Sequence, residues 1–214
     1  MAKRLVNRTL MSLALATVII AAATAQAAEF TPGVHYFKLN EPQPVQTGAQ
    51  VEVLEMFWYG CPHCYDLEPY IEKWVKTKPE NAEYVRLPTI FRPSWTLHAR
   101  AYYTFEALGK LDTFHREFFD EIHKRKNRIQ TPEELESFVV QRGIDKDKFY
   151  EAYNSFAVDS KLRHAQLITA RYEANGVPTI VVDGKYRATA SSAGGHQELM
   201  QLVSELVEKA AAER

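Results

Sequence analysis

The residues of this chain best suited to covalent chemistry are two cysteines three positions apart, Cys61 and Cys64. They are the only cysteines among 214 residues. A bridge across so short a loop restrains the unfolded chain little, and domains that depend on disulfides for stability usually carry four or more cysteines spread through the sequence. The pair therefore indicates redox chemistry rather than a structural cross-link.

The residues around the pair favour a reactive thiolate. Gly60 ends an apolar run, and Pro62 suits the first position of a helix. Cys61 would then be the N-cap, where free N–H groups and the positive end of the helix dipole favour thiolate over thiol. His63 adds a potential cation beside the sulfur. Because stabilising the thiolate stabilises the reduced form, this arrangement predicts a disulfide that is readily donated.

A metal site is the alternative interpretation of a Cys-x-x-Cys pair, since such a pair can be half of a zinc site. No second pair follows, and the remaining histidines show no ligand spacing; they are His35, His98, His115, His123, His164 and His196. We therefore expect neither a metal nor a bound cofactor.

One acidic residue is a further candidate. Glu55 lies six residues before Cys61, inside the apolar run 51–58, which is expected to be a buried strand. An unpartnered carboxylate is costly there. Burial should raise the pKa of Glu55 and make it a candidate proton donor or acceptor for Cys64. The alternative is a structural acid that is merely hydrogen-bonded.

The elements that must position these residues alternate between strand and helix. The run 51–58 is followed by an expected helix over 62–77 and a strand over 83–90, which makes a βαβ unit with the cysteines at its first turn. A third strand is expected over 177–182, before a hairpin turn at Asp183-Gly184 and a C-terminal amphipathic helix.

Residues 94–175 lack convincing strands and carry helix signals instead. Expected signals are a cap at Ser94, a capping box over residues 131–134, a cap at Asp145 and a helix end at Asn175-Gly176. By contrast, three prolines at positions 32, 42 and 44 predict an irregular lead-in over 28–50. The simplest organisation is a helical block inserted between a βαβ half and a ββα half.

The N-terminus has the pattern of an export signal. Basic residues at positions 3, 4 and 8 precede an apolar stretch over 10–23 and the sequence Ala25-Gln26-Ala27. The stretch is shorter than the roughly 20 residues that span a bilayer. We therefore expect residues 1–27 to be a signal peptide.

Charge gives no reason to expect a nucleic-acid partner. Residues 1–27 hold three of the 26 basic residues and none of the 27 acidic ones, so the remainder has a formal charge of −4. The one basic cluster, residues 123–128, is expected to close a helix, where cations complement the dipole.

The segment 57–65, Phe-Trp-Tyr-Gly-Cys-Pro-His-Cys-Tyr, resembles the active-site turn of the DsbA family of periplasmic thiol:disulfide oxidoreductases. The similarity extends to residues 153–156 and to Gly176-Val177-Pro178-Thr179, and it covers essentially the whole chain after residue 27. The resemblance implies an α/β, thioredoxin-like fold with an inserted helical domain. Its domains would be 28–93 together with 176–214, and its insertion 94–175.

The resemblance also implies roles for individual residues. Cys61 would be the exposed nucleophile and Cys64 its buried partner, while Pro62 and His63 would tune the redox potential. Val177-Pro178 would form a cis-proline loop that faces the cysteines and leaves its backbone free to pair with an extended substrate.

Glu55 matches the buried acid of the family. The lysine that pairs with that acid in the family is not evident here, and Tyr84 or Arg86 lies near the corresponding place. Trp58 and Tyr59 are interpreted either as an apolar rim for unfolded substrates or as core residues, and Phe91 is expected in the core.

The implied function is that of a periplasmic disulfide oxidase. It would donate its Cys61–Cys64 disulfide to unfolded or reduced exported proteins and be reoxidised by a DsbB-type, quinone-linked membrane protein. A monomer is expected, because the 23 residues over 28–50 are too few for the N-terminal dimerisation domain of family isomerases. The alternatives are an isomerase or reductase of the same fold and a non-redox periplasmic chaperone.

Overall fold

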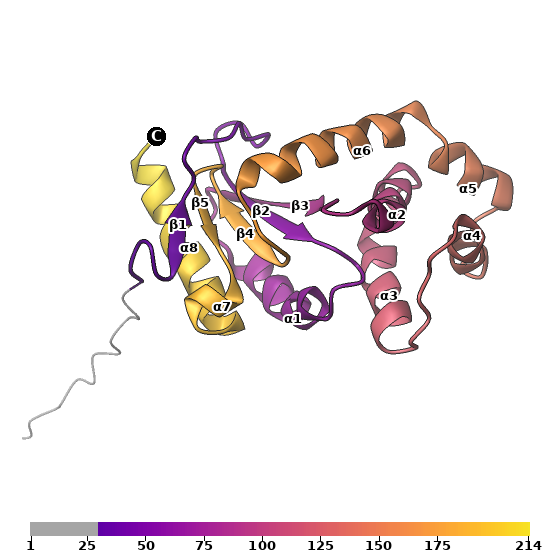
Figure 1. Cartoon of the computed structure of the whole chain (residues 1–214), viewed down its shortest axis with the longest axis horizontal. Coiled ribbons are helices and arrows are strands. Elements are labelled where there is room, and N and C mark those ends of the chain that lie inside the picture. The colour runs from indigo at the N-terminus through magenta and orange to yellow at the C-terminus, as the bar shows by residue number, and fades with distance from the viewer. Residues whose placement is uncertain (1–29) are drawn as a thin grey trace, which may run out of the picture.

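The computed structural model describes residues 30–214, so the expected signal peptide over 1–27 lies outside the described residues. Five strands form one mixed sheet in the order β1-β5-β4-β2-β3. Their bounds are β1 Tyr36–Lys38, β2 Val51–Phe57, β3 Ala82–Pro88, β4 Thr179–Val182 and β5 Tyr186–Ala188. Strand β2 is parallel to β3 and antiparallel to β4. This sheet forms one end of an elongated molecule, and a group of helices forms the other (Figure 1).

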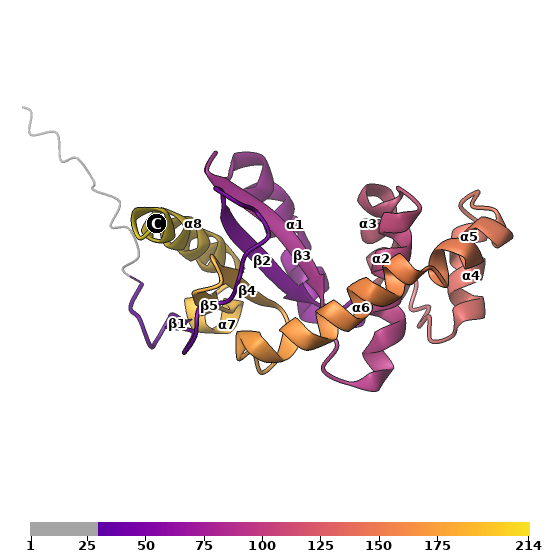
Figure 2. The same ribbon diagram turned by 90° about the horizontal axis from the view of Figure 1, so that it is seen from above.

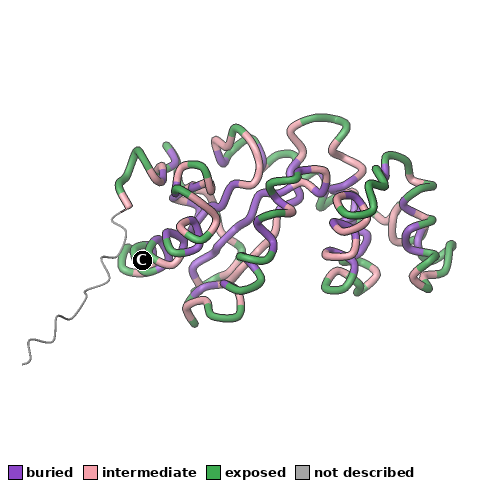
Figure 3. Tube along the Cα trace, turned by 90° about the horizontal axis from the view of Figure 1, so that it is seen from below, coloured by how far each residue is buried: buried purple, intermediate pink, exposed green. Residues whose placement is uncertain are grey.

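Helix α1 (Pro62–Thr77) connects β2 to β3, with the bounds that the sequence predicts. All seven residues of β2 are buried, because the sheet is covered on both faces (Figure 3). Side chains of α1 and of α8 (His196–Ala212) pack in one core cluster with Val51 and Val53 of β2. A second core cluster joins Leu54 and Met56 of the same strand to the inserted helices.

The segment between β3 and β4 is helical, as the sequence predicts, and it contains five α-helices. Figure 2 shows α6 running from the far end of this group back to the sheet. Their bounds are α2 Thr96–Ala107, α3 Leu111–His123, α4 Pro132–Val140, α5 Lys146–Tyr153 and α6 Phe156–Thr169. The capping box at Thr131 and the cap at Asp145 are both confirmed. Aromatic rings of α2, α3 and α4, among them Phe105, Phe118 and Phe138, meet edge-on and hold the helices together.

Two expected helix ends are wrong. Ser94 caps nothing, because Pro93–Trp95 forms a short 3-10 turn and α2 begins only at Thr96. Helix α6 ends at Thr169 rather than at Asn175-Gly176. A second 3-10 turn follows it, and Glu173 ends that turn in the left-handed conformation with φ of 52°. The Glu173 carboxylate accepts a hydrogen bond from the N–H of Asn40 at 2.9 Å, a contact that no local pattern predicts.

The segment 28–50, which was expected to be irregular, contains strand β1, so that expectation is wrong. This strand has three residues, too few to show an alternating pattern. It forms by antiparallel pairing with β5, in a register that places Tyr36 opposite Ala188. The prolines at 32, 42 and 44 lie outside it.

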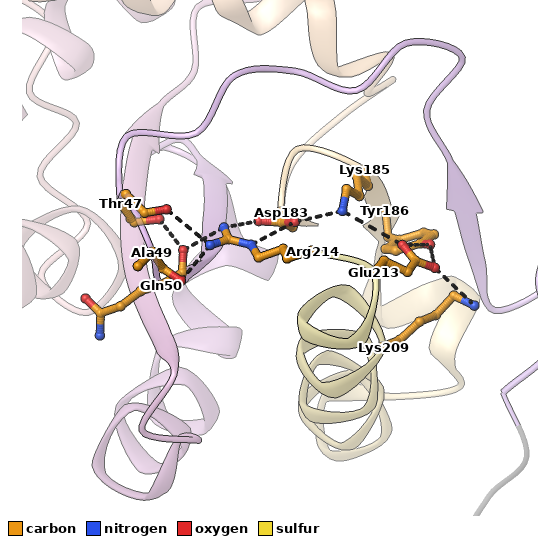
Figure 4. Close-up of polar contacts among 10 residues, drawn as sticks. Thr47, Ala49, Gln50, Asp183, Lys185, Tyr186, Lys209, Glu213 and Arg214 are labelled. Carbon is orange, nitrogen blue, oxygen red and sulfur yellow. Dashed lines mark hydrogen bonds and ion pairs between the residues drawn. The ribbon is translucent and has the colours of Figure 1, made fainter.

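The hairpin turn between β4 and β5 is confirmed, with positive φ at Asp183 (51°) and Gly184 (61°), as a tight hairpin turn of this kind requires. Arg214, two residues after the end of α8, pairs with the Asp183 carboxylate and donates hydrogen bonds to the carbonyls of Ala49 and Gln50 (Figure 4). The turn, the last helix and the segment before β2 are thereby joined.

The remaining helix, α7 (Ala190–Ala193), is a single turn between β5 and α8. Within residues 30–214 no helix combines the length and the apolar composition needed to cross a bilayer.

Candidate active site

Cys61 and Cys64 lie at the junction of β2 and α1, and both are free thiols in this structure. Cys61 is the N-cap of α1, and its Sγ accepts a hydrogen bond from the N–H of Cys64 at 3.4 Å. Pro62 occupies the first helical position, where the missing N–H breaks no hydrogen bond. The local structure therefore places one sulfur at the positive end of the helix dipole, as the sequence predicts.

The two sulfurs have opposite tendencies to ionise. The pKa of Cys61 is lowered to about 6, first by a hydrogen bond from the Cys64 side chain and then by the N–H groups of Cys64 and His63 and the charge of His63. Burial opposes this effect at Cys61. At Cys64 burial dominates and raises the pKa well above that of an ordinary thiol. At neutral pH, Cys61 is therefore a thiolate and Cys64 a thiol.

We predict that this thiolate can be titrated directly. Ultraviolet absorbance of the reduced protein, followed from pH 4 to pH 9, should rise with a midpoint near 6, because the folded protein stabilises the Cys61 anion. A free cysteine titrates near 8.5. The Cys61→Ser variant, measured in parallel, should lack this transition. A wild-type midpoint above about 8 would contradict the prediction.

Only one of the two cysteines has the exposure that the family resemblance implies. Cys64 is fully buried, as the family resemblance implies, but Cys61 retains only 7% exposure and is not an openly exposed nucleophile. Pro62 and His63 are both exposed. The reason lies in the loop before β4, since the Cys61 thiol is 3.5 Å from the carbonyl oxygen of Val177. The loop therefore leaves only a small part of the Cys61 surface accessible to a substrate.

The loop that covers Cys61 contains the cis peptide bond between Val177 and Pro178, which the resemblance predicts. Both residues are half-buried and immediately precede β4. Because β4 pairs with β2, this loop is held beside the end of β2 from which the cysteines follow. The sheet therefore brings together residues 116 positions apart in the sequence.

Glu55 is fully buried on β2, as expected. Its pKa is raised to about 7, first by burial and then by the nearby carboxylate of Glu68, while Arg86 and Tyr84 act in the opposite direction. The hydroxyl of Tyr84 donates a hydrogen bond to Glu55 Oε2, and Arg86 Nε lies 3.3 Å from the same oxygen. Both residues that the sequence offers in place of the family's lysine thus contact the acid, because β3 runs parallel to β2 and places Arg86 opposite Glu55.

Sequence reasoning missed a second buried acid, Glu68, and its histidine partner. Glu68 on α1 accepts a hydrogen bond from Arg86 Nη2 at 3.2 Å, and its other oxygen lies 3.1 Å from His115 Nε2. A carboxylate accepts only, so Nε2 carries the proton and His115 Nδ1 accepts from the hydroxyl of Tyr59 at 2.8 Å. Glu55, Arg86, Glu68, His115 and Tyr59 therefore form one continuous buried network.

Of the two residues that were missed, one had a signal in the sequence. Glu68 follows Cys64 by four residues, which places both on the same face of the expected helix. His115 had none, because its contact depends on how α3 packs against α1. Tyr59 is fully buried and therefore belongs to the core. Phe91 was expected in the core but is only half-buried.

Trp58 packs against the active-site turn. Its ring stacks on Trp95 with centroids 4.4 Å apart. A Cβ at Gly60 would lie 2.2 Å from the Trp58 ring, so glycine is required there by close approach. Trp58 thus forms one wall beside the cysteines.

Two cavities flank the turn that carries the cysteines. The first, the His63 groove, has a volume of about 570 Å³ and is lined by Phe37, His63 and His196 with residues 175–179 and 187–192. The second, the Pro62 groove, has a volume of about 640 Å³ and is lined by Trp58, Gly60, Pro62, His98, Ile122, His123, Lys126 and residues 128–130. Each groove therefore borders the active-site turn, the first at His63 and the second at Gly60 and Pro62.

Comparison with known families identifies the domain. A family model described as the DSBA-like thioredoxin domain matches residues 80–207. The thiol:disulfide interchange protein DsbA of Pseudomonas aeruginosa is 41% identical over 195 residues, which cover 91% of this chain and 92% of that protein. The DsbA protein of Azotobacter vinelandii is 41% identical over 182 residues and covers 85% of each chain.

Solved structures agree with the sequence comparison. The crystal structure of Pseudomonas aeruginosa DsbA superposes with a TM-score of 0.81 at 42% identity, covering 86% of this chain and 97% of that chain. The DsbA oxidoreductase of Xylella fastidiosa superposes with a TM-score of 0.77 at 26% identity, covering 83% and 96%. The fold is therefore thioredoxin-like with an inserted helical domain, as the resemblance implies.

Proposed function

This chain belongs to the DsbA family of thioredoxin-like proteins, and we propose that it is a disulfide oxidase that transfers its Cys61–Cys64 disulfide to reduced cysteines of exported polypeptides. The observation that carries the proposal is the opposite shift of the two thiols. The pKa of Cys61 is lowered to about 6, and that of Cys64 is raised. The folded protein stabilises the reduced form of such a pair, and this makes the disulfide a strong oxidant.

The transfer takes two exchange steps. A substrate thiolate attacks Sγ of Cys61 in the disulfide, the bond between Cys61 and Cys64 breaks, and Cys64 leaves with the electron pair. The second substrate thiolate then attacks the substrate sulfur of the mixed disulfide, and Cys61 leaves as a thiolate. The substrate loses two electrons to become a disulfide, and the enzyme gains them as a dithiol. The lowered pKa of Cys61 makes it a good leaving group in the second step.

Glu55 supplies the proton that the leaving Cys64 requires. Cys64 is fully buried, and burial opposes its anion. Glu55 lies close enough for its charge to raise the pKa of Cys64, and its own pKa of about 7 leaves it partly protonated at neutral pH. Burial and the nearby charge of Glu68 keep this pKa raised, while Arg86, Tyr84 and His115 act against them.

The remaining residues position the substrate and set the redox potential. The backbone at Val177-Pro178, next to the sulfur, pairs with an extended substrate strand. Pro62 and His63 tune the potential, His63 through its charge. The reaction needs no metal or bound cofactor, since both electrons reside on the two sulfurs.

The cellular setting that we propose is the one that the resemblance to the DsbA family implies. Residues 1–27 direct export and are removed. The mature protein is a periplasmic monomer with a thioredoxin-like domain over 28–93 and 176–214 and an insertion over 94–175. A DsbB-type, quinone-linked membrane protein restores its disulfide.

The test is a stoichiometric transfer. The oxidised protein is mixed with a reduced two-cysteine peptide, and the peptide disulfide formed is quantified. We expect one peptide disulfide for each protein disulfide lost. Equilibration with glutathione should give a potential more oxidising than that of thioredoxin, about −270 mV. A value at or below that figure would favour the reductase alternative. Protection of unfolded chains without any transfer would favour the chaperone.

A further inference from the structure

The two grooves beside Cys61 share a charge pattern that differs from that of the chain as a whole. The His63 groove is lined by Arg187, and the Pro62 groove by Lys126 and Arg128. Neither groove has an aspartate or glutamate among its lining residues in the described part of the chain. Beyond residue 27, however, acidic residues outnumber basic ones. Within residues 30–214, the lining of both grooves beside the active-site turn therefore carries basic side chains and no acidic ones.

Arg187 is held in place without an acidic partner. It lies on β5 opposite Phe37 of β1, and its guanidinium sits over the Phe37 ring at 4.9 Å from the centroid. Among residues 30–214 no carboxylate lies within ion-pair distance of it, and its Nε has no hydrogen-bond partner. Because the Phe37 ring already orders the Arg187 side chain, binding of an anion to Arg187 costs little further side-chain conformational entropy.

The basic segment after α3 divides into two pairs. Lys124 and Arg125 form ion pairs with Asp120 and Glu121 of the preceding turn. Lys126 and Arg128 line the groove instead, and neither forms an ion pair within the described residues. The expectation that this cluster merely closes a helix therefore fits its first half only. Lys126 and Arg128 are therefore available to pair with acidic groups of another molecule.

We propose that the two grooves bind acidic residues of the reduced polypeptide on either side of its reacting cysteine. The inference rests on the proposed function and names the substrates that this site favours. An extended chain with its cysteine at Cys61 passes from one groove to the other, since Val177 and His63 line the first and Gly60 and Pro62 the second. Concave surfaces of one sign attract oppositely charged chains and raise the association rate. Salt must weaken such a preference.

The experiment uses three reduced peptides that differ only in the residues flanking their two cysteines, which are Asp, Asn or Lys. Their oxidation by the oxidised mature protein, residues 28–214, is followed by stopped flow. At low ionic strength we expect the second-order rate constant for the Asp peptide to exceed that for the Lys peptide by about tenfold, and the difference between them to narrow at 1 M salt. Because flanking charges also change the reactivity of the peptide thiols, the deciding quantity is the Asp-to-Asn rate ratio in wild type relative to each variant.

Two variants test the grooves, and a third is the matched control. Arg187→Gln and the double variant Lys126→Gln/Arg128→Gln should each lower the Asp-to-Asn ratio by about threefold or more. The double variant Lys124→Gln/Arg125→Gln removes the same charge from the same exposed segment but leaves both grooves intact, so its ratio should equal that of wild type. Thiolate titration shows that each variant retains its active site.

The outcomes separate the two proposals. If neither groove variant lowers the Asp-to-Asn ratio, or if the control lowers it as much as Lys126→Gln/Arg128→Gln does, the acidic preference is refuted while the oxidase function stands. If wild type oxidises none of the peptides, the oxidase function itself is refuted. Should Arg187→Gln fail to fold, the double variant at the exposed positions 126 and 128 still decides the matter.

Discussion

Cys61→Ser is expected to react with a small aromatic disulfide at pH 7 at least about a thousandfold more slowly than Cys64→Ser. Each variant retains one cysteine, so each is the control for the other. In Cys64→Ser the remaining thiol is Cys61, which is largely ionised because its pKa is lowered to about 6. In Cys61→Ser the remaining thiol is Cys64, which is fully buried and has a raised pKa. The measurement is the rate of mixed-disulfide formation by stopped flow.

The choice of substituent provides a second check. The hydrogen bond from the Cys64 side chain is the largest cause of the low Cys61 pKa. A serine hydroxyl can replace that donor, and an alanine methyl cannot. Cys64→Ala should therefore titrate at a higher pH than Cys64→Ser. Equal rates for Cys61→Ser and Cys64→Ser would show that the two sulfurs are equivalent, which the proposed mechanism does not allow.

The parts of the site that could be predicted from the sequence depend on neighbouring residues. Gly60, Cys61 and Pro62 specify a strand end, an N-cap and a first helical position within three residues, and α1 begins where this pattern predicts. Burial of Glu55 follows in the same way from its apolar neighbours. These features could be predicted because each depends only on a few residues that are adjacent in the sequence.

Contacts between distant elements could not be predicted in this way. Strand β1 exists because β5 offers it an unpaired edge, and the lead-in sequence carries no sign of that. The sequence placed Tyr84 and Arg86 near Glu55 but could not tell which contacts the acid, because alternation along β3 would place them on the same face. His115 reaches Glu68 only through packing of an inserted helix. The acid–base environment of the thiols is therefore a product of tertiary structure.

That environment has a measurable consequence for stability, and Glu55→Gln should reveal it. The variant is expected to be more stable than wild type by about 3 kcal/mol at pH 8 and nearly equal to it below pH 4. The pKa of Glu55 is about 7 in the folded protein against an ordinary 4.5. Below 4.5 the acid is protonated in both the folded and the unfolded chain, so glutamine changes nothing. Above 7 the folded protein must hold a buried anion, which a neutral amide of the same shape removes.

The direction of the pH dependence follows from proton uptake. Between pH 4.5 and 7 the folded protein holds a proton on Glu55 that the unfolded chain has already released. Wild-type stability therefore falls as pH rises through this range, by about 1.4 kcal/mol for each unit of pKa difference. Arg86 retains Glu68 as a partner at 3.2 Å, so the variant leaves no unpaired cation.

Urea unfolding of the reduced protein at pH 4, 6 and 8 measures the effect, with Glu208→Gln as an exposed control on α8 that should follow wild type. A variant that is destabilised at pH 8 would show that Glu55 is an ordinary ion-pair partner of Arg86, and an advantage that does not change with pH would show that the pKa of Glu55 is not raised. The same variant reports on mechanism, because glutamine cannot give a proton to Cys64. Its exchange rate should lose the titration near pH 7 that the wild-type acid confers. A gain in stability together with a loss of that titration would mean that this fold tolerates a costly buried charge where the departing sulfur needs its proton.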